Sequence, residues 1–152
     1  AAGRSLLAMK FLAMRLMQIG LKVYLVGEVC TPSIREGDLL LVGSGSGETA
    51  GMIAICKKAK AAGAEVAAFT KNRNSTIASI AKVAVQLNTA KPIQEGAAGP
   101  EGWIEGNYFS IRPSGNPFEQ SIVIVGDAMV CELMQKTNCG TAKIAYNHAN
   151  LE

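Results

Sequence analysis

The chain has 152 residues, of which 49% are hydrophobic, 18% charged and 5% aromatic. This length fits one domain, and the composition excludes disorder as the default state. The formal net charge is only +3, and the basic residues form no run of the kind that nucleic-acid binding requires. No apolar stretch reaches the length of a membrane span, so neither nucleic acid nor a membrane is an expected partner.

Metal-ligand residue types are few and scattered. They are Cys30, Cys56, Cys131, Cys139 and the single histidine, His148. No two cysteines form a Cys-x-x-Cys pair, so no metal or other cofactor is expected. We expect the thiols to be buried or inert, as in a reducing compartment. With no signal peptide at the start of the sequence, a cytoplasmic location is expected.

The first predicted element is a helix from Ser5, as its N-cap, to about Gln18, and Gly20 ends it. Its apolar face is wide enough to cover a sheet and a second partner, such as another subunit. A short strand is expected over residues 22–26, before a loop with Thr31 and Pro32.

Strands and helices then alternate. Strands are expected at 38–42, 65–69 and 83–87, and helices at about 50–62 and 74–81. The run 38–42 is almost wholly apolar, which is typical of a strand buried on both faces of a parallel sheet. The alternation therefore predicts an α/β fold.

Residues 88–116 break this pattern with many glycines and prolines, so a long functional or mobile loop is expected there. A final helix is expected from Pro117 to about Met134. The tail at 142–152 has room for one or two more helical turns.

The strongest chemical signal is the segment 43–49, Gly-Ser-Gly-Ser-Gly-Glu-Thr, between a buried strand and a helix. Glycines allow close approach of a ligand, and the free N–H groups of a helix start favour an anion. Ser44, Ser46 and Thr49 add hydroxyl donors. No Gly-Lys-Ser/Thr follows, and Glu48 stands where a dinucleotide fingerprint has its third glycine. The segment predicts a seat for a small monophosphate; the alternative is a tight turn that binds nothing.

Two further candidates flank helix starts. Loops at the carboxyl ends of neighbouring parallel strands meet in one crevice, so Arg4 and Ser5 are expected to face the same ligand as residues 44–49. Ser5 as a simple N-cap is the better-supported alternative. Glu119 is a candidate general base, and Asp127 is a weaker one. With Asn116 as N-cap and Pro117 at the first helical position, a capping box would also explain Glu119 completely.

His148 is the last candidate. A lone histidine in a C-terminal tail is usually just exposed, but its imidazole suits proton transfer near neutral pH. It reaches a site only if the tail folds back or crosses to a neighbouring subunit.

The segment 44–49 resembles the phosphosugar-binding signature of the sugar isomerase (SIS) domain superfamily. More narrowly, several segments are similar to the 6-phospho-3-hexuloisomerase family, and they cover nearly the whole chain in order. They are Gly3-Arg4-Ser5, 13–16, 27–28 with Thr31-Pro32, 37–39, Pro113 with Gly115, Phe118-Glu119-Gln120 and the closing His148-Ala149-Asn150-Leu151-Glu152.

The resemblance implies a single SIS domain over 1–152 with a flavodoxin-like α/β/α sandwich, a five-stranded parallel sheet and a homotetramer. It implies interconversion of 3-hexulose 6-phosphate and fructose 6-phosphate in the ribulose monophosphate pathway, without a cofactor. Ser44, Gly45, Ser46, Gly47 and Thr49 would hold the phosphate, with Arg4 and Ser5 on the sugar phosphate. Glu119 would be the base, and His148 would act from a neighbouring subunit.

Two departures stand out. Leu6 replaces a glycine of the family pattern. Family members also carry a helix and a first strand before Gly3, so the chain is expected to be N-terminally truncated and unstable alone.

The rival functions are another SIS-type phosphosugar isomerase, a non-catalytic phosphosugar sensor, and a flavin mononucleotide binder, which the low aromatic content disfavours.

Overall fold

The computed structural model describes residues 1–88 and 116–151. Its centre is a parallel sheet in the order β1-β2-β3. The strands are β1 (Leu39–Gly43), β2 (Glu65–Thr70) and β3 (Val83–Gln86), each within one residue of its predicted range. In the register, Ala68 of the middle strand pairs with Val42 on one side and Ala84 on the other.

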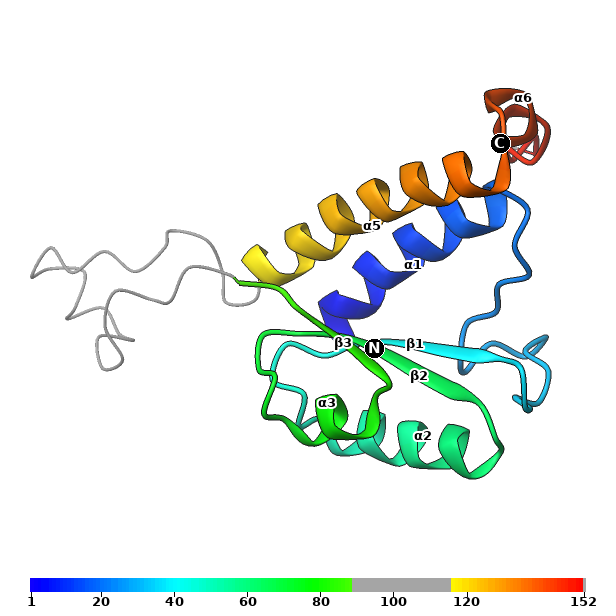
Figure 1. Ribbon diagram of the computed structural model, residues 1–152. Coiled ribbons are helices and arrows are strands. Elements are labelled where there is room, and N and C mark those ends of the chain that lie inside the picture. Colours follow the sequence, from blue (N-terminus) through cyan, green and yellow to red (C-terminus); the bar gives the residue numbers. More distant parts are fainter. Residues whose placement is uncertain (89–115, 152) are drawn as a thin grey trace, which may run out of the picture.

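Helices cover both faces of the sheet (Figure 1). One layer contains α2 (Ala50–Ala61) and α3 (Thr76–Ile80), and the other contains α1 (Gly3–Gln18) and α5 (Asn116–Thr137). A short helix, α6 (Thr141–Tyr146), lies at the far end of the α1–α5 pair. The predicted three-layer α/β/α sandwich with a parallel sheet is confirmed.

Two hydrophobic clusters fill the spaces between the layers because side chains alternate along each strand. Leu40 and Val42 of β1 pack with Val66 and Ala68 of β2 under α2. Phe69, which points to the other face, packs with the helices α1 and α5. The middle strand thus contributes to both clusters, as expected for a strand buried on both faces.

Two helix ends follow the predicted glycine pattern. At the end of α1, the N–H of Gly20 donates to Met17 O and that of Leu21 donates to Leu16 O, the pair of bonds that defines a Schellman motif. Gly20 has φ +96°, a conformation that glycine adopts without strain. Gly63 closes α2 in the same way, with φ +84°.

The strand predicted over 22–26 is wrong. The segment pairs with no strand among the described residues, and Tyr24 and Val26 are more than half exposed. An apolar, β-branched segment becomes a strand only where a neighbour supplies ladder hydrogen bonds. The sheet likewise has three strands in the described part of the chain, against the five that the resemblance implies.

The thiols are only partly as expected. Cys56 is fully buried in the core, and burial raises the pKa of its thiol. Cys30 and Cys131, however, are exposed, and all four cysteines are free. Cys30 and Cys131 lie on the outer surfaces of a loop and a helix, where nothing covers them within the residues described.

None of the described helices combines the length and apolar character that a bilayer crossing requires.

Candidate functional site

Loop 43–49 runs from the end of β1 to the start of α2, and its backbone is fixed to the end of β2. The N–H of Ser44 donates to Phe69 O (3.0 Å), and Gly45 O accepts from the N–H of Lys71 (3.0 Å). These bonds continue the parallel ladder beyond the last paired residues of the sheet. The loop therefore has a fixed position at the carboxyl edge of the sheet.

The hydroxyls of the loop are partly used to hold its shape. Ser44 is buried, and its Oγ accepts from the N–H of Gly47 (3.1 Å) and lies 3.2 Å from Thr49 Oγ1. Whichever of Ser44 and Thr49 donates in that pair, one O–H remains for a ligand. Ser46 Oγ accepts from the N–H of Glu48 (3.2 Å), which also leaves its O–H available.

Backbone donors converge on the same place. The N–H groups of Gly45, Ser46, Thr49, Ala50 and Gly51 have no hydrogen-bond partner in the part of the chain that is described. Thr49 is the N-cap of α2, so these donors lie at the positive end of a twelve-residue helix. Neutral donors in this arrangement suit a phosphate group.

The other side of loop 43–49 is anchored to α3. Gly47 O accepts from the N–H of Ile77 (3.1 Å), and Glu48 Oε1 accepts from the N–H of Thr76 (2.7 Å). This backbone bond holds the pKa of the Glu48 carboxyl below its ordinary value near 4.5. Glu48 therefore connects loop 43–49 to α3 by a hydrogen bond, in addition to its predicted place at the positive end of α2.

Arg4 and Glu119 meet at the starts of α1 and α5. Arg4 Nε donates to Glu119 Oε2 at 3.3 Å, and the Glu119 side chain is only 13% exposed. The contacts do not support a capping box at Glu119, because Asn116 already lies inside the helix and the carboxylate is bonded to Arg4. The carboxylate is thus held by a residue of another helix.

The Arg4–Glu119 pair and loop 43–49 lie next to each other. Phe118, the residue before Glu119, packs against Gly45: a Cβ there would lie 3.4 Å from Phe118 Cδ1. The aliphatic end of Lys71 lies on the same glycine, with its Cε 3.2 Å from that position. The structure therefore brings the predicted anion seat and the predicted base to one edge of the sheet.

Ser5 is not the N-cap of α1. The N-cap is Ala2, which has extended backbone angles, and Ser5 lies in the first helical turn. The N-cap lies three residues earlier than the capping preference of serine predicts. The Ser5 hydroxyl has no hydrogen-bond partner among the residues described, which leaves it available to a ligand.

Asp127 and His148 are farther away. Asp127 forms an ion pair with Arg15 (3.7 Å), two turns along α5 from Glu119. His148 is exposed and follows Asn147, whose Nδ2 donates to Gln18 O at the last residue of α1. Because Arg4 is in the first turn, the helix separates the two ends by about 21 Å at 1.5 Å per residue. In one copy of the chain, His148 is therefore not at the site.

Sequence reasoning missed Thr70, the last residue of β2, and Lys71 and Ser75, which follow it beside the loop. Thr70 and Ser75 are fully buried, and Thr70 Oγ1 accepts from the N–H of Asn72 (3.1 Å). Their position after a parallel strand, next to the strand that carries the loop, was the available signal. It was weak because Thr, Lys and Ser are also common in ordinary loops.

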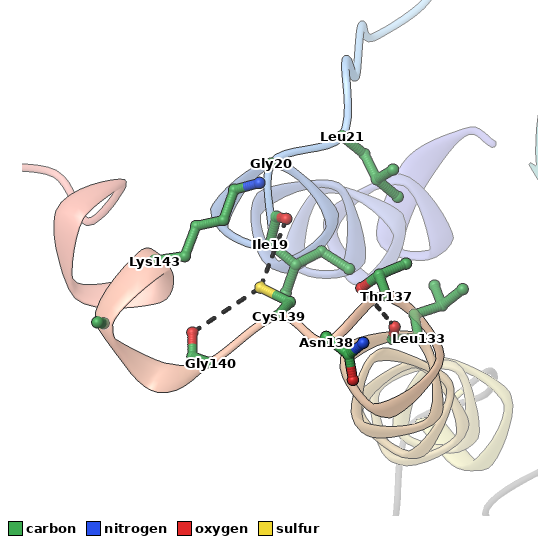
Figure 2. Close-up of a pocket in the computed structure, with 10 residues that line it drawn as sticks. Ile19, Gly20, Leu21, Leu133, Thr137, Asn138, Cys139, Gly140 and Lys143 are labelled. Carbon is green, nitrogen blue, oxygen red and sulfur yellow. Dashed lines mark hydrogen bonds between the residues drawn. The ribbon is translucent and has the colours of Figure 1, made fainter.

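A cavity of about 410 Å³ lies at the opposite end of the molecule, between the ends of α1 and α5 and the start of α6 (Figure 2). Cys139 and Lys143 line it, and the Cys139 thiol donates weakly to Ile19 O (3.6 Å). None of the predicted site residues lines this cavity.

An α/β/α sandwich with a glycine- and hydroxyl-rich loop where a parallel strand meets a helix start is typical of phosphate-binding α/β domains. A comparison with protein families narrows this class, because the model of the SIS domain matches residues 1–99. The chain belongs to the SIS domain family.

Named relatives are similar over nearly the whole chain. A 3-hexulose-6-phosphate isomerase of Bacillus subtilis is 39% identical over 99% of this chain and 77% of its own length. One of Mycobacterium gastri is also 39% identical, over 99% of this chain and 71% of its own. A crystal structure from Methanococcus jannaschii, described as inferring a 3-hexulose-6-phosphate isomerase function, is 30% identical with a TM-score of 0.81, covering 100% of this chain and 76% of that one.

Proposed function

We propose that the protein interconverts 3-hexulose 6-phosphate and fructose 6-phosphate. The observation that carries the proposal is the Glu119 carboxylate held beside loop 43–49, with Phe118 of the same turn packed on Gly45. A carboxylate next to a phosphate seat is what a sugar-phosphate isomerase requires, and two relatives with this name are 39% identical to the chain over 151 residues.

The reaction moves a carbonyl from C3 to C2. Glu119 takes the proton from C2, the electrons of that C–H bond form the C2–C3 double bond of an enediol(ate), and the proton returns to C3. A second proton moves from the C2 oxygen to the C3 oxygen. The reaction is redox-neutral overall, so no oxidant or reductant is consumed.

Each binding residue has a role in this proposal. The hydroxyls of Ser44, Ser46 and Thr49 and the backbone N–H of Gly45 form the phosphate seat, and Gly47 allows the turn that positions them. The seat uses binding energy to orient the reacting carbons. Arg4 and Ser5 hold the sugar phosphate from the start of α1. The Arg4 guanidinium is also placed to favour negative charge that develops beside Glu119.

His148 acts in this proposal from a neighbouring copy, where it shuttles the proton between the two oxygens. The assembly proposed is the homotetramer that the resemblance implies. A cytoplasmic location and a place in the ribulose monophosphate pathway belong to the same proposal.

The test uses 3-hexulose 6-phosphate made in situ by the preceding synthase, with fructose 6-phosphate as the product measured. Glu119→Gln should lower kcat by about 10²- to 10⁴-fold and leave phosphosugar binding in place. Glu132→Gln is the matched control, because Glu132 is an exposed carboxylate on the same helix whose one ion pair among the described residues is with Lys136 at 4.0 Å.

If Glu119→Gln kept its turnover, the role of the base would be reassigned to His148 or Asp127. A panel of pentose and heptose phosphates separates the proposed substrate from those of other SIS isomerases. Saturable binding without any product would instead indicate a phosphosugar sensor.

A further inference from the structure

Loop 43–49, the proposed phosphate seat, has no positive side chain of its own to balance the charge of a phosphate. Its donors are hydroxyls and backbone N–H groups, which are neutral, and loop 43–49 contains no Lys or Arg. The one charged residue of the loop, Glu48, is negative. A sugar phosphate carries nearly two negative charges near neutral pH, so a cation close to the loop would add substantially to binding.

Arg4 supplies that charge only in part. Its Nε lies 3.3 Å from Glu119 Oε2, so the guanidinium faces a carboxylate that offsets its charge. If Glu119 is the base, it has to be ionised when the substrate binds, and this offset persists in the complex.

Lys71 is a cation in contact with the loop. Its Cε lies 3.2 Å from the Cβ position of Gly45, and its side chain is exposed. Its ammonium forms no ion pair with any of the residues that the structure describes.

The backbone of Lys71 is fixed on both sides, although its ammonium is not. The N–H of Lys71 donates to Gly45 O (3.0 Å), and its own carbonyl accepts from Gln86 Nε2 (3.2 Å). The root of the side chain therefore keeps one position next to the loop, and rotation of the last bonds is enough to bring the ammonium to a bound anion.

We propose that Lys71 is a further binding residue of this site, whose ammonium pairs with the phosphate of the substrate while its stem packs on Gly45. The inference rests on the proposed function, because it deepens the phosphate seat. It assigns to Lys71 the role that a lysine inside the loop has in other phosphate-binding turns.

The test compares Lys71→Met with Lys71→Arg in the full chain. Methionine keeps an apolar stem on Gly45 and removes only the charge. Lys71→Met should raise KM for the sugar phosphate about tenfold with kcat nearly unchanged, and Lys71→Arg should restore most of the affinity. Lys57→Met, which removes an exposed charge from the outer surface of α2, should leave KM unchanged.

Inorganic phosphate provides a second readout. As a competitive inhibitor, it should bind about tenfold more weakly to Lys71→Met, and the salt dependence of its inhibition constant should become shallower. A purely structural role of Lys71 predicts a lower thermal midpoint with no change in phosphate inhibition, and that result would overturn the proposal.

The outcomes separate the two proposals. If the wild type isomerises its substrate and Lys71→Met keeps the wild-type KM, or loses kcat alone, the role of Lys71 is wrong and the function stands. If the wild type binds neither inorganic phosphate nor a sugar phosphate, the phosphate seat itself is wrong and the proposed function fails with it.

Discussion

Gly47 and Glu48 are neighbours in loop 43–49, but they hold it in different ways. Gly47 has φ +70°, and a Cβ on it would collide with Oγ of the buried Ser75. Glu48 reaches across to the backbone of Thr76. The first residue allows the close approach of the loop to α3, and the second fastens it there.

Gly47→Ala should therefore destabilise the protein by at least about 1–2 kcal/mol, because alanine is strained at positive φ and Ser75 has no free space to retreat into. Denaturant unfolding measures the change. Gly51→Ala is the control, since nothing lies within 4 Å of a Cβ there and the residue is helical; it should be neutral or slightly stabilising. Equal stabilities of the two variants would contradict the argument.

Glu48 makes the loop sensitive to acid. Its pKa is lowered in the folded state by the Thr76 N–H bond, so its stabilising contribution is complete above the unfolded pKa near 4.5. That contribution is lost as pH falls through the lower folded value. The thermal midpoint of Glu48→Gln should therefore depend less on pH below about 4.5 than that of the wild type. Glu36→Gln, at an exposed carboxylate that forms no ion pair with a described residue, is the matched control.

At this scale, the sequence predicted that loop 43–49 lies between a buried strand and a helix start, but not how its atoms are used. The glycine and hydroxyl pattern of 43–49 is the basis for proposing an anion seat there. It did not indicate that Ser44 is largely engaged with Gly47 and Thr49, or that Arg4 pairs with Glu119. Residues 115 positions apart meet only through the fold.

Helices α1 and α5 form the layer that carries both Arg4 and Glu119. Leu12 is 2% exposed in the cluster between them, and its Cδ1 would lie 3.2 Å from a Cβ on Gly126. The small residue on α5 allows the two helices to approach closely at this point. The packing of this pair therefore sets the distance between the two charged side chains at its start.

Leu12→Ala should lower the free energy of unfolding by about 2–5 kcal/mol, because it leaves a cavity in a closely packed interface. It should also raise KM, since Arg4 and Glu119 depend on the same packing. Leu7→Ala, at a leucine of the same helix that is 68% exposed, should cost less than about 1 kcal/mol. Chemical denaturation and steady-state kinetics together test both statements.

Element boundaries were predictable where residues close in the sequence determine them, but not where a partner distant in the sequence does. Gly20 and Gly63 end their helices as their sequence positions predict, because a Schellman motif needs only the last turn and the glycine. The residues 22–26 have the composition of a strand but lack a partner in the described structure. The helix around Ser5 begins earlier than a serine cap predicts because Ala2 adopts the extended N-cap conformation.

For the whole molecule, the position of His148 leads to the clearest prediction. It lies beyond α6, at the opposite end of α1 from Arg4, so a catalytic role requires another copy of the chain. Several side chains on α1 are available for contact with that copy: Phe11, Met14 and Met17 are between 37% and 41% exposed.

Mixing two inactive variants tests this arrangement. Glu119→Gln and His148→Ala should each be nearly inactive, whereas an equal mixture after dissociation and reassembly should regain about a quarter of wild-type activity. This fraction follows if each site combines Glu119 of one copy with His148 of another across a symmetric interface. Full activity in His148→Ala alone, or no recovery in the mixture, would contradict a shared site.

The middle strand has a consequence for the order in which the protein opens. Because β2 contributes side chains to both hydrophobic clusters, its backbone amides should be among the last to exchange with deuterium. Ser44 and Gly45 are bonded to the residues at the end of that strand. Fraying of the outer helices should therefore leave loop 43–49 in place until the last cooperative unit unfolds, and phosphate bound there as proposed should slow exchange of the whole chain only through that unit.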